Sequence, residues 1–376
     1  MANPTIPIFN TLEQDEVSQI DEWLRLLVEL GGSDLHLRVP SPPVIRVDGE
    51  LVIQDQYANL KTADLEAVLD EIAKPEQKET FLREKELDFA YSLAGVARFR
   101  VSVMRQRGTL SMAFRQVPFQ ILSMERLGVP AICKELILKP RGMILVCGPT
   151  GSGKSTTMAA MVDYLNQNAS RNVITIEDPI EYLHSNKKCL IAQRDLGDDT
   201  KAFAVALKHA LRHDPDVIIV GEMRDLETIS TAIAAAETGH LVVGTLHTTD
   251  AAQTVDRVID IFPPSQQQQI RLQFSQVIEA VLVQTLIPRL NAKGRVPAFE
   301  VMIASPAVRN LIREQKTHEI TNVIQLSGKD GMQTLDQSLS DLLRKNLISK
   351  EEALLKSSHP EKLQKLLQYQ ATAGFR

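Results

Sequence analysis

The chain has 376 residues with a formal net charge of −5 at pH 7, and 44% of its residues are hydrophobic and 24% charged. This length predicts about two to three domains of an ordinary globular protein, and the mild acidity gives no general basic field for binding nucleic acid. The three cysteines lie too far apart for a CxxC zinc pattern and fit a reducing compartment. We expect neither a signal peptide nor a membrane-spanning segment, and therefore a cytoplasmic protein.

Residues 18–118 are expected to form a small α+β domain. A first helix is predicted because apolar residues recur at helical spacing until two glycines at 31–32; these residues are Ile20, Trp23, Leu24, Leu27 and Val28. "SDLHLRV" and "PVIRVDGELV" alternate apolar and polar residues, and the Asp-Gly pair at 48–49 predicts a hairpin turn. "TADLEAVLDEIA" predicts a capped amphipathic helix, and short strands follow it.

Residues 119–134 are interpreted as a linker, and residues 135–304 as a parallel, doubly wound α/β core. Four strands of the buried type, "MILVCG", "NVITIED", "DVIIVGE" and "HLVVGTLH", alternate with helices predicted at 154–167, 202–212, 226–238 and 250–261. The chain from "SQQQQIRLQFSQVIEAVLVQTL" onward is expected to be mostly helical, with one hairpin near "RVPAFEVMIA". Residues 305–376 are predicted to form a helical C-terminal region.

"GPTGSGKST", residues 148–156, follows the first of these strands and fits the pattern G-x-x-x-x-G-K-[ST]. Such glycines let backbone N–H groups cradle a polyphosphate, a lysine reaches the β/γ-phosphates, and the hydroxyl that follows ligates Mg²⁺. The alternative is a glycine-rich turn between a strand and a helix, which the complete pattern in this context disfavours. We therefore predict binding of ATP and Mg²⁺, with Ser155 as the metal ligand, by Gly148, Pro149, Thr150, Gly151, Ser152, Gly153, Lys154, Ser155 and Thr156.

Hydrolysis of ATP needs a carboxylate that orients or deprotonates the attacking water. Candidates at strand ends are Glu177, Asp178, Glu181 and Glu222, although each could instead cap a helix or pair with an arginine. "DVIIVGE" has glycine at 221 where such strands usually end in Asp, so Glu222 is expected to act on Mg²⁺ through water.

Two histidines, His240 and His247, bracket the strand "LVVGTL". They are seven residues apart and cannot share a face of the strand. His247 stands at the carboxyl end, where α/β sheets bind ligands, and is predicted to sense the γ-phosphate. His240 is expected to secure the start of the strand or to make a subunit contact.

Residues 98–115 contain five arginines but no lysine and no acidic residue. Two interpretations are open. The arginines could bind nucleic acid phosphates, or Arg98, Arg100 and Arg115 could reach the triphosphate of a neighbouring subunit as arginine fingers. The acidic net charge favours the second.

Three longer segments carry a family resemblance. "ITIEDPIEYLH" (174–184), "DVIIVGEMRDLET" (216–228) and "TGHLVVGTLHTTDAAQTVDRVIDIFP" (238–263) resemble the Asp box, Walker B box and His box of the type II/type IV secretion ATPase superfamily. Together with "GGSDLHL" near the start and "AVRNLIREQK" near the end, they make the chain similar to the PilT-type retraction ATPases of type IV pili over about residues 20–350.

This resemblance implies a RecA-like P-loop ATPase core behind a PAS-like N-terminal domain. It further implies a homohexameric motor that powers pilus retraction and twitching motility, attached to the inner membrane through a platform protein, with a second retraction ATPase as a further candidate partner. Glu181, the last glutamate of the Asp box, matches the general base. No nucleic acid and no membrane span are expected.

Three other functions remain open. Pilus-assembly and type II secretion ATPases of the same superfamily usually carry a longer N-terminal region and a tetracysteine zinc insertion, which we do not find here. A DNA-translocating motor would be expected to show a basic channel loop. A non-hydrolysing regulatory subunit is disfavoured by intact Lys154, Glu181 and Glu222.

"SPAVRNLIREQK", residues 305–316, predicts a helix with Ser305 as N-cap and Val308, Leu311 and Ile312 in a buried stripe. Arg309 and Arg313 lie four residues apart on another face, where like charges repel unless an anion meets them. This face is either merely solvated or, as the resemblance implies, couples domain movement to the pilus platform. In the second case, replacing both arginines by alanine leaves ATPase activity within about threefold and blocks retraction.

Overall fold

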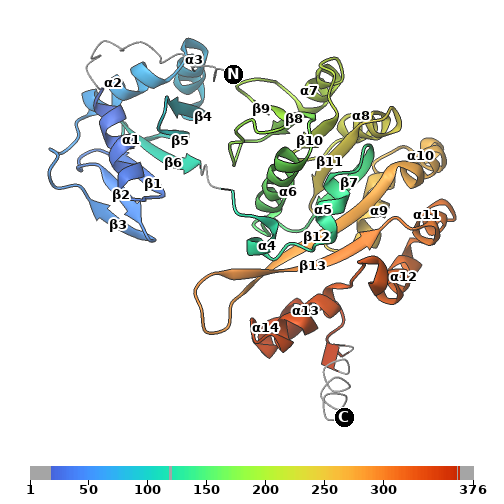
Figure 1. Cartoon of the computed structure of the whole chain (residues 1–376). Coiled ribbons are helices and arrows are strands. Elements are labelled where there is room, and N and C mark those ends of the chain that lie inside the picture. The colour runs from blue at the N-terminus through green and yellow to red at the C-terminus, as the bar shows by residue number, and fades with distance from the viewer. Residues whose placement is uncertain (1–17, 118–120, 362, 365–376) are drawn as a thin grey trace, which may run out of the picture. The chain divides into compact units, whose positions relative to one another are not determined.

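A computed structural model describes residues 18–117, 121–361 and 363–364, and the chain divides into two compact units, 1–118 and 119–376 (Figure 1). Each unit is considered by itself. Residue 118 of the expected N-terminal domain, residues 119–120 of the expected linker, and residues 362 and 365–376 of the expected C-terminal region lie outside the described residues.

The first unit is an antiparallel sheet of six strands in the order β3-β2-β1-β6-β5-β4. The α+β prediction for this part of the chain is confirmed. Alternate strand residues such as Leu35, Phe99 and Phe114 pack with Trp23 and other helix residues in one core, which leaves polar side chains on the opposite face of the sheet. The elements are α1 Gln19–Glu29, β1 Asp34–Arg38, β2 Val44–Val47, β3 Glu50–Ile53, α2 Thr62–Ile72, α3 Pro75–Glu84, β4 Glu86–Leu93, β5 Ala97–Gln106 and β6 Thr109–Val117.

The hairpin predicted at 48–49 is confirmed. Asp48 and Gly49 both have positive φ, 50° and 91°, as a two-residue turn between paired strands requires, and Val47 faces Glu50 across it. The predicted helix in "TADLEAVLDEIA" is α2, and Lys61 is its N-cap. The helix α3 was not foreseen, since Phe81 is its one buried residue and leaves little periodic signal.

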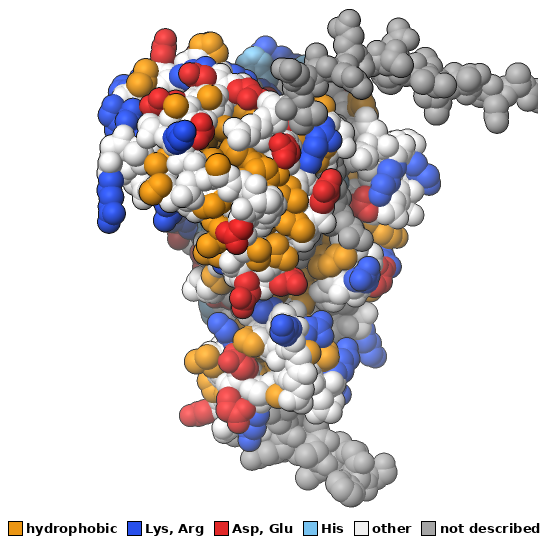
Figure 2. Space-filling model, turned by 90° about the vertical axis from the view of Figure 1, so that its left-hand side faces the viewer, with side chains coloured by type: hydrophobic (Ala, Val, Ile, Leu, Met, Phe, Trp, Pro, Cys, Tyr) orange, Lys and Arg blue, Asp and Glu red, His pale blue; other side chains and the backbone are white. Residues whose placement is uncertain are grey.

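Figure 2 shows one face of the molecule, on which acidic and basic side chains are interspersed around a group of apolar ones. Apolar side chains are exposed on the edge strand β3 of the first unit, where Leu51 and Ile53 are 57% and 54% exposed. Both lie on a strand with one hydrogen-bonded neighbour, β2.

The second unit is a seven-stranded sheet in the order β13-β12-β7-β11-β10-β8-β9, parallel throughout except for the antiparallel pair β12–β13. The predicted doubly wound, RecA-like α/β core is confirmed. Its strands are β7 Gly142–Cys147, β8 Asn172–Glu177, β9 Leu190–Asp195, β10 Val217–Val220, β11 Leu241–Leu246, β12 Ile278–Pro288 and β13 Arg295–Ile303.

Helices cover both faces of this sheet (Figure 1). Successive residues of β7 alternate between two cores: Met143 and Leu145 pack with one set of helices, whereas Ile144 and Val146 pack with the other. The first core includes α7 Phe203–Ala210, α8 Leu226–Glu237, α9 Ala251–Asp260 and α10 Pro264–Val277; the second includes α4 Met124–Leu127, α5 Ile132–Ile137 and α6 Lys154–Asn168.

Two strands of the sheet differ from expectation. The segment "IEAVLVQTLIP", expected to continue a helix, is β12 and pairs in parallel with β7. Its run of β-branched and other apolar residues suits a strand that is buried on both faces. The strand β9 was not predicted, and it adds a parallel edge beside β8. In addition, Met124 and Cys133 of the expected linker are buried in the second unit's core.

The C-terminal helices belong to the same unit. Ser305 caps α11 Pro306–Arg313 as predicted, and Val308 and Ile312 are fully buried with Leu311 packed against them. The remaining elements are η1 Thr317–Glu319, α12 Ile320–Leu326, η2 Gly328–Asp330, α13 Leu335–Arg344 and α14 Lys350–Lys356. Within the described ranges, every helix is too short or too polar to cross a membrane.

Candidate nucleotide site

The predicted phosphate-binding loop joins β7 to α6. Gly148 has φ 138°, and a Cβ atom there would lie 2.2 Å from the carbonyl oxygen of Gln284. Gly153 has φ 87°, and its Cβ would lie 2.9 Å from the side-chain nitrogen of Gln284. Both positions therefore need glycine for conformation and for space. The loop ends at the N-terminus of α6, which favours an anion.

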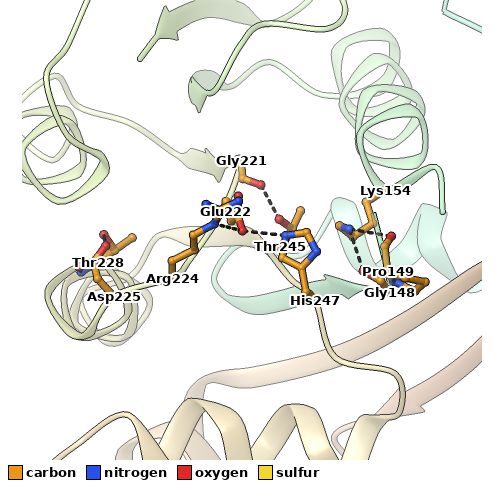
Figure 3. A network of polar contacts seen from close by, with 10 residues as sticks. All are labelled: Gly148, Pro149, Lys154, Gly221, Glu222, Arg224, Asp225, Thr228, Thr245 and His247. Atoms are coloured by element: carbon orange, nitrogen blue, oxygen red, sulfur yellow. Dashed lines mark hydrogen bonds and ion pairs between the residues drawn. The ribbon is translucent and has the colours of Figure 1, made fainter. Parts of the chain in front are cut away.

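Lys154 begins α6, and its ammonium group turns back onto the loop. Its Nζ donates to the carbonyl oxygens of Gly148 at 2.8 Å and Pro149 at 3.2 Å (Figure 3). Burial lowers the pKa of this lysine, and the carboxylates of Glu222 and Glu181 are among the groups that favour its charged form. The ammonium group is therefore held beside the loop by acceptors that a phosphate can replace.

Gln284 is a site residue that the sequence analysis missed. It comes from β12, is 3% exposed, and accepts a 2.7 Å hydrogen bond from the Thr157 hydroxyl in the first turn of α6. Its backbone and amide lie against the two glycines that flank the loop. The one available signal was a lone glutamine in the apolar run "AVLVQTLIP".

Glu222 lies just beyond the end of β10, between the side chains of His247 and Arg224. His247 Nε2 is 2.7 Å from its Oε1, and Arg224 contacts the same oxygen through Nε (Figure 3). The glycine at 221 has a structural reason, because a Cβ there would lie only 3.0 Å from the Ile176 carbonyl oxygen. An Asp at that position would therefore need strand β8 to move.

A hollow of about 70 Å³ lies beside the start of α6 and the end of β8; it is lined by Ser155, Glu177, Asp178, Glu181 and Glu222, among others. A larger cavity of about 470 Å³ is lined by Thr150, Glu222, Arg224, His247 and Arg257 together with Met223, Leu246 and Thr248. Glu222 borders both. The structure thus brings together the P-loop, the Asp-box acids and the predicted γ-phosphate sensor.

The acids of the Asp box differ in environment. Glu177 is largely buried, and burial raises its pKa above the usual value although hydrogen bonds from Thr175 and Gln193 oppose the shift. Asp178 and Glu181 are exposed. The exposed carboxylate of Glu181 lines the same hollow as Ser155 and is accessible to water, so Glu181 remains the predicted base.

The donor set around Ser155 suits a hard divalent cation. Mg²⁺ prefers oxygen ligands and usually keeps several waters, so one hydroxyl, substrate phosphates and nearby carboxylates acting through water are sufficient. The Ser155 hydroxyl and the carboxylate of Glu222 line the same hollow. The residues present therefore fit Mg²⁺, which would neutralise phosphate charge during transfer.

Other members of the predicted site have different partners. The Thr156 hydroxyl is 2.9 Å from the Tyr182 hydroxyl, which ties α6 to the Asp-box loop. The Ser152 hydroxyl is buried and has no hydrogen-bond partner among the described residues. His240 Nδ1 lies 2.9 Å from the Ala235 carbonyl oxygen, so this histidine secures the turn before β11, which is the first of the two roles expected for it.

The three predicted arginine fingers all lie in the first unit. Arg115 donates to Asp34 at 2.8 Å, and Arg98 donates to the Ser92 hydroxyl at 3.3 Å. Arg100 stands directly opposite Arg115 across β5 and β6, where like charges repel. Asp34, from strand β1, supplies the acid that the sequence lacks between residues 98 and 115.

The expectation that Arg309 and Arg313 form one exposed basic face is wrong. Arg309 donates to Glu279 at 2.8 Å and to the carbonyl oxygens of Ser275, Gln276 and Ala304. It therefore caps the C-terminal end of α10 and its charge is already paired. Arg313 is exposed and donates at 3.3 Å to the Asn310 side chain.

Comparisons with known proteins agree with this geometry. The family described as "Type II/IV secretion system protein" matches residues 81–355. The type IV pilus retraction ATPase PilT of Pseudomonas aeruginosa is 49% identical over 342 residues, covering 91% of this chain and 99% of that protein. A twitching motility protein of Neisseria gonorrhoeae is 47% identical, covering 85% and 86%. The crystal structure of the pilus retraction motor PilT with bound ADP matches with TM-score 0.85 at 44% identity, covering 92% and 98%.

Proposed function

The chain belongs to the type II/IV secretion system protein family and is an ATP-hydrolysing enzyme, and on this premise we propose that it powers type IV pilus retraction as a homohexamer. The observation that carries the proposal is the match to a pilus retraction ATPase over 99% of that relative's length. Two P-loop glycines without room for a Cβ atom and the Lys154 ammonium group beside the loop support it. The motor works in the cytoplasm at the inner membrane, where a pilus platform protein holds it and a second retraction ATPase is a candidate partner.

The residues divide the chemistry among them. The P-loop and Lys154 bind the β- and γ-phosphates, and a water attacks the γ-phosphorus. Glu181 accepts the proton of that water while the bond from the γ-phosphorus to the bridging oxygen breaks, which gives ADP and phosphate. Ser155 would hold Mg²⁺, which would neutralise phosphate charge, and Glu222 would act on the ion through water. His247, hydrogen-bonded to Glu222, detects loss of the γ-phosphate.

The ring is proposed because Arg98, Arg100 and Arg115 would supply charge to a neighbour's triphosphate. Arg100 is the strongest candidate for an arginine finger, because Arg115 is already paired with Asp34. Mixing Arg100→Ala subunits with Lys154→Ala subunits then restores part of the activity, because each type provides what its neighbour lacks. Mixtures no more active than the sum of their parts contradict shared sites. Light scattering with and without nucleotide tests for six subunits.

A pilus-assembly or type II secretion ATPase is the nearest alternative. The three cysteines of the chain are all buried, at Cys133, Cys147 and Cys189, and stand on separate elements or loops, which does not suit a tetracysteine zinc insertion. A deletion strain decides the direction of work. Retraction predicts cells that carry many pili but do not twitch, whereas loss of pili in the deletion strain supports assembly.

A DNA-translocating motor is the alternative from another class. Charges of both signs are interspersed on the face in Figure 2, and the net charge is −5, so neither favours a phosphate backbone. Duplex DNA titrated at low salt is the test. Salt-sensitive binding together with DNA-stimulated ATPase activity would favour this alternative, and their absence favours the pilus motor.

A further inference from the structure

The loop that carries Glu181 has little structure of its own. Residues 178–184 lie in neither helix nor strand, and none of the backbone–backbone hydrogen bonds found in the described chain involves them. One apolar side chain, Ile180, anchors the loop in the core at 5% exposure. Backbone groups without backbone partners need side chains or water to hold them in place. The position of Glu181 therefore depends on side chains from other elements.

Gln193 on β9 supplies most of these contacts. Its Nε2 donates to the Tyr182 carbonyl oxygen at 2.8 Å and to Glu177 Oε1 at 3.0 Å. Its Oε1 accepts from the backbone N–H of His184 at 2.8 Å. The Gln193 amide thus hydrogen-bonds to the loop backbone on both sides of residue 183 and connects the loop to the end of β8.

Glu177 fixes the loop from its other end. Its Oε1 accepts from the Thr175 hydroxyl at 2.6 Å and from Gln193 at 3.0 Å, and the backbone of Glu181 is near enough to lower the pKa of this carboxylate. A carboxylate that is largely buried and accepts hydrogen bonds from two neighbouring strands is held in place by the fold. Glu177 therefore provides a fixed point close to residue 181.

The loop is also tied to the phosphate-binding helix. The Tyr182 hydroxyl lies 2.9 Å from the Thr156 hydroxyl in the first turn of α6. A continuous chain of hydrogen bonds therefore runs from β9 through Gln193 and Tyr182 to the residue next to Ser155. Glu181 stands between these fixed points with its own side chain exposed.

We propose that Gln193 is a positioning residue that holds the Asp-box loop, so that the carboxylate of Glu181 meets the attacking water at the P-loop. The inference rests on the proposed role of Glu181 as general base. Gln193 touches neither nucleotide nor water in this role; it acts through the backbone of residues 182 and 184. Misplacement of a catalytic group by about 1 Å can cost on the order of 10²-fold in rate, so the amide has a large effect on turnover.

Two variants test the proposal. Gln193→Leu removes all three hydrogen bonds at similar size, and Gln193→Glu keeps the acceptor but loses the donor and faces the Glu177 carboxylate. Both should lower kcat by about 10-fold or more, while the Kd for ADP measured by calorimetry changes less than about threefold. At low pH the new carboxylate of Gln193→Glu is protonated and can donate a hydrogen bond again. The loss of kcat relative to the wild type at the same pH therefore becomes smaller for Gln193→Glu as pH falls, but not for Gln193→Leu. A general loss of structure would not produce this difference.

The matched control is Gln273→Leu, which removes a partly exposed glutamine on α10 whose Nε2 donates to Glu237 at 3.0 Å. Its kcat stays at the wild-type value. In the double variant Gln193→Leu with Glu181→Gln, kcat equals that of Glu181→Gln alone, because both changes remove the same function. Two outcomes overturn the positioning role and leave the general base intact. In the first, Glu181→Gln lowers kcat and Gln193→Leu does not. In the second, the double variant loses as much kcat as the two single losses combined. Wild-type kcat in Glu181→Gln refutes the general base, and the positioning role with it.

Discussion

Two cations in the second unit, Lys154 in the P-loop and Arg309 on α11, both hydrogen-bond to backbone carbonyl oxygens, yet they serve different purposes. Lys154 has two neutral acceptors from its own loop. Arg309 has three carbonyl oxygens and the carboxylate of Glu279, gathered from α10, β12 and the start of its own helix. A charge with few, neutral partners stays available to a ligand, whereas a charge that is fully paired belongs to the fold.

The same contrast separates the acids. Glu181 is exposed beside the P-loop, but Glu300 on β13 is 6% exposed and accepts at 2.8 Å from the N–H of Ala251 at the start of α9. Mutation should therefore affect turnover in the first region and stability in the second. The following predictions test that division, beginning with the largest expected effect.

Lys154→Ala removes the ammonium group that faces the phosphates. We expect kcat to fall by at least about 10²–10³-fold, the scale for loss of one preorganised donor to developing charge. The melting temperature without nucleotide stays near the wild-type value, because the hydrogen-bond acceptors of the lysine among the described residues are two neutral carbonyl oxygens. ATPase assay and thermal melting check both statements. Near-wild-type turnover would contradict the assignment of Lys154 to the phosphate site.

Glu181→Gln keeps the shape of the side chain and loses its basicity. Hydrolysis should fall by about 10²-fold, while binding of ATP with Mg²⁺ is retained. Equilibrium binding and single-turnover hydrolysis separate the two quantities. A parallel loss of nucleotide affinity would mean that this glutamate is structural.

Arg309→Ala leaves Glu279 and three carbonyl oxygens short of their donor, although Lys139 still contacts Glu279 at 2.8 Å. The free energy of unfolding should fall by about 2–4 kcal/mol, as expected when one partner of a largely buried pair is removed. ATPase activity per folded molecule stays within about threefold. Urea unfolding measures the first quantity. An unchanged midpoint of urea unfolding would mean that Arg309 is not needed for stability and has a functional role, as Lys154 does.

Glu300 makes stability depend on pH. Burial raises its pKa from 4.5 to about 7, so the folded state binds this proton more tightly than the unfolded state. Stability is then greatest below the unfolded pKa, and it decreases by roughly 1–3 kcal/mol as pH rises to about 7. Glu300→Gln should flatten this decrease, whereas the exposed control Glu319→Gln should not. Unfolding curves between these pH values measure the slope, and equal slopes in all three proteins contradict the prediction.

Arg313→Ala should have the smallest effect on the purified protein. Its side chain is exposed, so we expect a stability change under about 0.5 kcal/mol and ATPase activity within about threefold. In cells the variant should carry pili and fail to retract them if α11 couples to the pilus platform. Testing Arg313 alone avoids the stability loss that Arg309→Ala adds. Normal twitching of cells with this variant would contradict a role of Arg313 on α11 in coupling the ATPase to the pilus platform.

The sequence alone determined the features that are local along the chain. The P-loop, the hairpin at 48–49, the Ser305 cap and four parallel strands depend on residues close together in sequence, where turn chemistry and hydrophobic periodicity act directly. The predicted first residues of the helices that begin at 154 and 226 were confirmed for the same reason, and their last residues differ by one.

Tertiary structure decided which side chains from distant strands support those local features. Gln284 reaches the P-loop from β12, Gln193 reaches the Asp-box loop from β9, and Asp34 pairs with Arg115 across 81 positions of sequence. Neither β9 nor β12 was predicted, because a strand's place in a sheet depends on long-range pairing and register. Arg309 shows the same limit: its position on α11 followed from helical spacing, but its partner Glu279 is brought to it only by the packing of α10 and β12.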